Sequence, residues 1–239
     1  MVLQKPNSEK AMESKTEPRF GEELKSEIDF CNEYYLNLLG YKPEKTKLQI
    51  FQERQWNSFC ERVGLEENSS GVYLPRNQTA FIKGENPLTL FHEYFGHGLF
   101  CERTQIGQRL VNLEKELLKE EQQEFDGKEF TLEDLKKFRK QNQTFFSLDN
   151  FRKENLTQYE SFAFWTEYLL SEKLGADEKF GADEKFGRRY DEFSSDDKQL
   201  VEGAINFSEQ YGELATFHGF GFSCLKSETY IDERRYKLI

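Results

Sequence analysis

The sequence predicts a mostly helical α+β fold, and two observations support this. About half of the 239 residues fall into segments expected to be helical, several of which begin at a capping residue or end at a glycine. Only three short stretches, all before residue 85, have the pattern of strands. The polar and charged segment 1–18 is expected to be a disordered leader. Residues 19–239 are expected to form a single domain.

The first part of the chain predicts two helices around a short strand. A helix over 21–39 ends at Gly40, because glycine adopts the backbone angles of a helix C-terminus at little cost. Residues 48–51 are a candidate strand. A second helix over 54–63 ends at Gly64 in the same way.

A β-hairpin is predicted next, over 71–75 and 79–82, with its turn at 76–78. Pro75 has no backbone N–H, so the first strand must be an edge strand or end there. Asn86-Pro87 then predicts a helix start, with asparagine as the cap and proline in the first helical position.

The second half of the chain predicts further helices. Their expected bounds are 103–125, a helix opened by the capping box at Thr131–Asp134, one from Asn155 to Leu174 with Gly175 as its stop, and one from Ser194 or Ser195 to about His218. The six residues of 175–180 are repeated at 181–186, which indicates a local duplication in an exposed loop.

Composition excludes several classes of protein. A net charge of −11 argues against a nucleic-acid partner, which would require a basic surface. No apolar run approaches the ~18 residues that span a bilayer, and no apolar region near the N-terminus resembles a secretory signal. The four cysteines show no C-x-x-C pair, so we expect reduced thiols in a cytoplasmic protein.

The most informative segment is His92-Glu93-Tyr94-Phe95-Gly96-His97, which contains two of the three histidines in the chain. Two imidazoles can hold a zinc ion, and a neighbouring carboxylate can activate water. The segment is one residue longer than the common H-E-x-x-H pattern. A buried helix with two incidental histidines is the alternative interpretation.

The longer spacing has a geometric consequence. Residues five apart on a regular α-helix point about 140° apart, so His92 and His97 could not reach one metal ion. A π-bulge at 94–96 would realign them, and such bulges favour functional sites. Gly96 is expected to adopt the unusual backbone angles that a bulge requires.

A zinc site needs a third protein ligand, for which a carboxylate, a cysteine or His218 is available. The apolar and aromatic helix over 159–167 is the best source, because a charged group there needs a partner. Glu160 and Glu167 are seven residues apart and share a face of this helix. One could bind the metal while the other supports a ligand. Cys101 lies near His97 in sequence, but a small buried apolar role is the expectation for it.

These two motifs resemble those of gluzincin-type metallopeptidases. The segment 92–98 is similar to the H-E-x-x-G-H-G motif of the dipeptidyl-peptidase III family. The segment 160–167 resembles the E-G-W-A-L-Y-x-E helix of some uncharacterised bacterial metallopeptidases. The resemblance implies a zincin-like core, with Glu160 as the third zinc ligand and Glu93 as the general base. The chain departs from dipeptidyl-peptidase III in having no room for its second lobe, and in its second motif.

The resemblance also implies a residue that stabilises the oxyanion of the reaction. In related peptidases a downstream histidine or tyrosine donates that hydrogen bond. His218 is the first candidate and Tyr230 the second. The predicted strand over 79–82 would form the rim of the cleft and pair with an extended peptide substrate.

The sequence therefore predicts a zinc-dependent peptidase that acts on a peptide substrate, with neither a nucleic-acid nor a membrane partner. Two rival hypotheses remain. One is a metal-binding or scaffold protein that keeps the fold and has lost turnover, and the other is a helical interaction protein without metal. The presence of Glu93 argues against the first rival, since a site without catalysis has no need for that carboxylate.

Overall fold

The computed structural model describes residues 2–3, 21–66, 68–174 and 195–223. Within these ranges, no helix combines the length and the apolar character needed to cross a membrane. The predicted leader over 1–18 lies outside them, except for Val2–Leu3, which form strand β1. The duplicated segment over 175–186 also lies outside the described residues.

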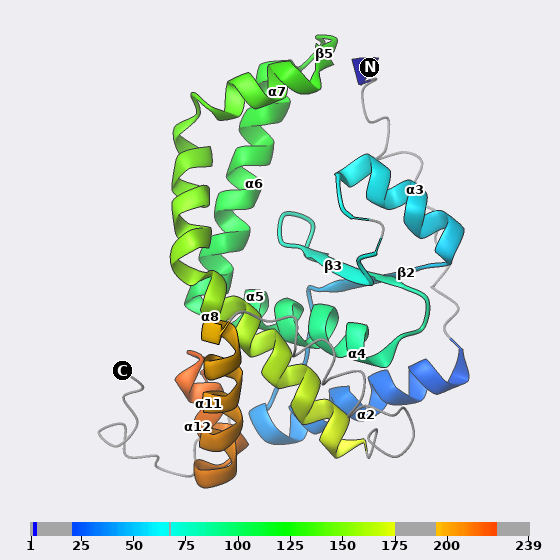
Figure 1. Ribbon diagram of the computed structural model, residues 1–239, viewed down its shortest axis with the longest axis vertical. Coiled ribbons are helices and arrows are strands. Elements are labelled where there is room, and N and C mark those ends of the chain that lie inside the picture. The colour runs from blue at the N-terminus through cyan, green and yellow to red at the C-terminus, as the bar shows by residue number, and fades with distance from the viewer. Residues whose placement is uncertain (1, 4–20, 67, 175–194, 224–239) are drawn as a thin grey trace.

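The described chain is mostly helical and contains two small sheets (Figure 1). The first half contains β1 (Val2–Leu3), α2 (Glu22–Leu39), β2 (Lys47–Phe51), α3 (Glu53–Val63), β3 (Gly71–Leu74), β4 (Thr79–Lys83), α4 (Pro87–Leu90), η1 (Phe91–Gly98) and α5 (Leu99–Arg103). The second half contains α6 (Gln105–Phe125), β5 (Phe130–Thr131), α7 (Leu132–Arg139), α8 (Gln143–Lys173), α11 (Ser195–Tyr211) and α12 (Glu213–Gly219). The predicted α+β class, with a small sheet before the motif helix, is confirmed.

The main sheet has the strand order β2-β4-β3, with β2 parallel and β3 antiparallel to β4. The central position of β4 corrects one expectation. Its backbone groups are bonded to a strand on each side, so the segment 79–82 cannot pair with a substrate. The two edge strands are β2 and β3, and the edge position of β3 agrees with the expectation from Pro75 at its end.

A buried carboxylate fixes this sheet to α5, the helix that continues η1. Glu102 of α5 is only 6% exposed, and its Oε1 accepts hydrogen bonds from Lys45 N at 2.9 Å and Thr46 N at 2.6 Å. Glu44 N donates to the other oxygen at 3.0 Å. Because the loop over 44–46 leads directly into β2, these bonds set where the sheet begins relative to α5.

The core between the helices is aromatic. Phe95 of η1 stacks on Tyr35 of α2, and Tyr35 meets Phe217 of α12 edge to face. On α8, Phe162 and Trp165 also contact Phe217. All five side chains are fully buried. The abundant phenylalanine in the sequence is therefore used to join α2, η1, α8 and α12 into one core.

Two helix boundaries differ from the prediction. Asn155 does not cap α8, which begins twelve residues earlier at Gln143, where the Asn142 side chain accepts from Phe145 N at 2.7 Å. Asn155 instead donates to the Phe151 carbonyl inside the helix. The predicted helix to His218 is divided at Gly212, whose φ of 87° a right-handed helix cannot contain.

The close contact between η1 and α8 depends on Gly96. A Cβ atom at this position would lie 2.7 Å from Ala163 Cα and 2.9 Å from Ala163 Cβ. Gly96 is not among the glycines with positive φ, so a left-handed backbone is not the reason for glycine here. It lets two helix backbones approach, whereas a side chain would push α8 away.

We therefore expect Gly96→Ala to lower the free energy of unfolding by about 1–3 kcal/mol, the usual cost of overpacking. Gly203→Ala on α11 is the matched control, because no atom lies within 4 Å of a Cβ there. The control should be neutral, or more stable by up to about 1 kcal/mol from helix propensity. Urea unfolding of both variants in the presence of a chelator measures the difference. Equal effects would contradict the packing role of Gly96.

Candidate metal centre

The motif segment is a π-helix over all eight residues of η1, with α-helix before and after it. The hydrogen bonds of a π-helix connect residues five apart, so such residues lie one above the other. This geometry places His92 and His97 on the same face. The predicted departure from α geometry is confirmed, and it is longer than the bulge expected at 94–96.

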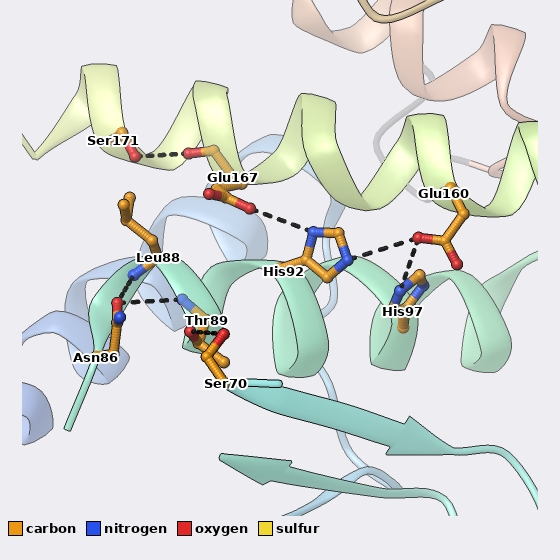
Figure 2. A network of polar contacts seen from close by, with 9 residues as sticks. All are labelled: Ser70, Asn86, Leu88, Thr89, His92, His97, Glu160, Glu167 and Ser171. Carbon is orange, nitrogen blue, oxygen red and sulfur yellow. Dashed lines mark hydrogen bonds and ion pairs between the residues drawn. The ribbon is translucent and has the colours of Figure 1, made fainter. Parts of the chain in front are cut away.

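The start of this helical segment follows from its capping residue. The Asn86 side chain accepts hydrogen bonds from Leu88 N at 3.0 Å and Thr89 N at 3.4 Å (Figure 2). Pro87 occupies the first helical position, where its missing N–H is not needed. The cap therefore fixes where the turn that leads into η1 begins, as the sequence predicted.

Glu160 reaches across from α8 to both imidazoles (Figure 2). Its Oε2 lies 3.7 Å from His92 Nε2 and 3.5 Å from His97 Nε2. One ligand atom from each of the three side chains lies within 4.8 Å of the others. The imidazoles are buried and the carboxylate is one-third exposed, so one side of the group faces solvent.

These distances fit a shared cation better than direct hydrogen bonds. Charge-assisted N–H···O bonds are about 2.7–2.9 Å long, shorter than either separation. Ligand atoms about 2.0–2.1 Å from a tetrahedral zinc ion lie roughly 3.4 Å from one another. Two imidazole nitrogens and one carboxylate oxygen are also a donor set that suits zinc. His92, His97 and Glu160 therefore form a group that could hold a metal ion.

Glu167 supports His92 from the other side of its ring. Its Oε2 lies 3.2 Å from His92 Nδ1, and its side chain has no exposed surface. A carboxylate there holds a proton on Nδ1 and leaves Nε2 as the metal-binding atom. The shared helix face predicted for Glu160 and Glu167 thus brings both carboxylates to one histidine, at opposite nitrogens.

Two aromatic rings hold the imidazoles in place. Tyr159 stacks on His97, with ring centroids 4.0 Å apart and planes inclined by 20°. Phe164 meets His92 edge to face at 4.4 Å. Neither residue was singled out from the sequence, although both lie within four residues of Glu160 on α8. Their contacts restrict ring rotation, which keeps the two Nε2 atoms directed at Glu160.

The electrostatics of the group favour a positive charge between its members. Burial lowers the pKa of His92, but contacts with Glu160 and Glu167 outweigh burial and raise that pKa to about 9. Burial raises the pKa of Glu160, but the charge of His97 and contacts with both imidazoles bring it below the usual range. The carboxylate of Glu160 is therefore ionised, and a metal cation could replace the proton that an imidazole would otherwise share with it.

Glu93 is buried beside these ligands, with 7% of its surface exposed. It lies close enough to His92 for its charge to raise the pKa of that imidazole. Gly71 at the start of β3 makes room for it, since a Cβ there would lie 2.8 Å from Glu93 Cγ. No sequence pattern associates this glycine with the site.

The other predicted site residues are not brought to this group. His218 is exposed at the end of α12, and its neighbour Phe217 packs on Phe162 and Trp165. The described contacts of His218 therefore give no support to an oxyanion role, because the fold buries the residue beside it and leaves the imidazole in solvent. Tyr230 lies outside the described residues. Cys101 is a buried thiol whose pKa is raised by burial, as expected of a core residue.

Comparison of the chain with protein-family models, with curated proteins and with solved structures finds no match. The identification of the site therefore depends on the geometry of the side chains described above.

The ligand assignment predicts one zinc ion per chain. Glu160→Ala should lower zinc affinity by ~10-fold or more, since a ligand should matter at least as much as the residues that support it. Glu154→Ala is a matched control, because Glu154 is exposed on the same helix. Chelator competition followed by metal analysis measures both variants. Unchanged affinity in Glu160→Ala would exclude the carboxylate as a ligand.

A second prediction concerns Glu167. Glu167→Gln keeps the size of the side chain and removes its charge, so the fold should persist while His92 binds metal less strongly. The expected loss of zinc affinity is about 10-fold, at the lower end for supporting residues. The same competition assay applies, with circular dichroism to show that the helices are intact. If zinc affinity equals that of the parent protein, Glu167 has only a packing role.

Proposed function

We propose that this protein is a zinc-dependent peptidase, and that η1, α8 and the main sheet form a zincin-like core. The observation that carries the proposal is the convergence of His92, His97 and Glu160, with the buried carboxylate of Glu93 beside them. Three protein ligands leave a fourth position for water or substrate, which is the arrangement of catalytic zinc sites.

The chemistry divides between the metal and the chain. A bound zinc ion would make water more acidic and would polarise the carbonyl of the peptide bond. Glu93 accepts the proton of the attacking water and passes it to the leaving amine. Glu160 and the two imidazoles hold the ion, and Glu167 keeps His92 in the tautomer that binds through Nε2.

The position of Glu93 suits this role, because its carboxylate is buried beside the candidate metal ligands. Its charge acts on His92, so we expect the carboxylate to lie near a molecule bound between the ligands. A structural zinc site would have no use for a free buried carboxylate at this position, which favours catalysis over a scaffold role.

The test of this proposal is Glu93→Gln, which preserves size and hydrogen bonding but removes the base. We expect this variant to bind zinc like the parent protein and to hydrolyse peptides more slowly by ~10²-fold or more, as for the loss of a general base. A peptide-library digest followed by mass spectrometry measures turnover, and metal analysis measures zinc.

Glu133→Gln on α7 is the control, because Glu133 is exposed and lies far along the chain from the ligands. It should change neither property. If the zinc-loaded parent protein cleaves no peptide, the peptidase function is excluded, and a metal-binding role remains. If Glu93→Gln cleaves as fast as the parent, Glu93 is not the base.

A further inference from the structure

A cavity of about 160 Å³ lies beside the candidate metal centre, between β3, α6 and α8. Most of its lining is apolar. The apolar lining residues are Tyr73, Pro75, Ile106, Leu110, Phe151 and Leu156. An apolar cavity of about 150 Å³ accommodates a molecule the size of benzene, so this one has room for the side chain of leucine or phenylalanine.

Two of the residues that line the cavity also contact His97, one of the proposed metal ligands. Tyr159 lines the cavity and stacks on His97 at 4.0 Å. Tyr73 lines the cavity too, and its ring centroid lies 6.5 Å from that of His97. The cavity is therefore separated from the metal centre by a single layer of aromatic rings, on the side of His97 rather than of Glu93.

The free edge of β3 connects the reacting groups to the cavity. Lys83 N donates a hydrogen bond to the Ser70 carbonyl, across the antiparallel pair of β3 and β4. Because the backbone groups of successive residues in a strand face opposite sides, those of Gly71 and Tyr73 face away from β4. Gly71 lies beside Glu93, and Pro75 at the other end lines the cavity. An extended peptide that pairs with this edge would run from Glu93 past His97 to the cavity.

The polar groups of the cavity wall are already engaged within the protein. Arg152 forms an ion pair with Glu114 of α6, and Asn155 donates to the Phe151 carbonyl. Leu156, one helical turn before Glu160, is 53% exposed at the cavity. A large apolar side chain left in solvent beside an apolar cavity gains most from an apolar ligand that covers it.

We propose that this cavity binds one apolar side chain of the peptide substrate, next to the cleaved bond on the side that lies over His97. The peptidase then selects leucine, methionine or phenylalanine at that one position and rejects small polar residues. The proposal rests on the proposed peptidase function, and it assigns the residues that set specificity.

The first test is a digest of a peptide library by the zinc-loaded, full-length protein. Large apolar residues should be enriched at one fixed position next to the cleaved bond. For a matched pair of peptides, leucine at that position should give a kcat/KM about 10-fold or more above that for serine, since an apolar pocket discriminates by factors of this order.

Two variants then test the cavity itself. Leu156→Asp at its exposed rim should lower kcat/KM for the leucine peptide by about 10-fold, with little change for the serine peptide and none in zinc content. Ile106→Trp should fill the cavity and move the preference toward alanine. Leu132→Asp on α7 is the control, because Leu132 is equally exposed at 54% and does not line the cavity.

The outcomes separate this proposal from the peptidase function. Cleavage without an apolar preference, or a preference that both variants leave unchanged, overturns the cavity as a specificity site while the peptidase function stands. A binding assay with Glu93→Gln and labelled peptides gives an independent result. Tighter binding of the leucine peptide, lost on adding Leu156→Asp, supports the cavity even if hydrolysis fails. Equal binding of both peptides together with no hydrolysis overturns both proposals.

Discussion

The contact of one carboxylate with two imidazoles is the constraint on which the rest of this structure depends. His92 and His97 place two imidazoles inside an aromatic core, where burying an unpaired charge costs several kcal/mol per group, and the partly exposed Glu160 is their shared partner. They avoid that cost only if η1 and α8 are held at one distance and one rotation. Gly96 permits the distance, because it lets the backbones approach at Ala163.

The helix α8 meets this constraint by presenting two different faces. Glu160 and Glu167 point toward η1, with Ala163 between them. Phe162 and Trp165 point toward α12, where they pack on Phe217. Burial of the aromatic face supplies the free energy that holds the polar face in place, since fully burying such a side chain contributes about 1.5–3 kcal/mol. The position of Glu160 in the candidate metal centre therefore depends on apolar contacts made on the opposite side of the same helix.

Local chemistry was predictable from the sequence, and long-range geometry was not. Gly40, Gly64 and the capping residues Asn86 and Thr131 act through neighbours a few residues away, so their patterns identify the same helix ends in the structure. The spacing of the two histidines likewise predicted a departure from α geometry, since a regular helix could not bring them together. By contrast, Asn142 and Asn155 are equally good capping residues, and only tertiary packing decides between them.

The same distinction explains which site residues were missed. Glu160 and Glu167 were found because charge in an apolar helix needs a partner, which is a property of the sequence alone. Gly71 and Tyr159 carry no such signal, because their roles arise only when β3 and α8 meet the motif helix. Because Gly71 has no side chain, Glu93 has room beside the edge of the sheet. If the protein is the peptidase proposed above, the same short strand would position both Glu93 as the general base and an extended substrate.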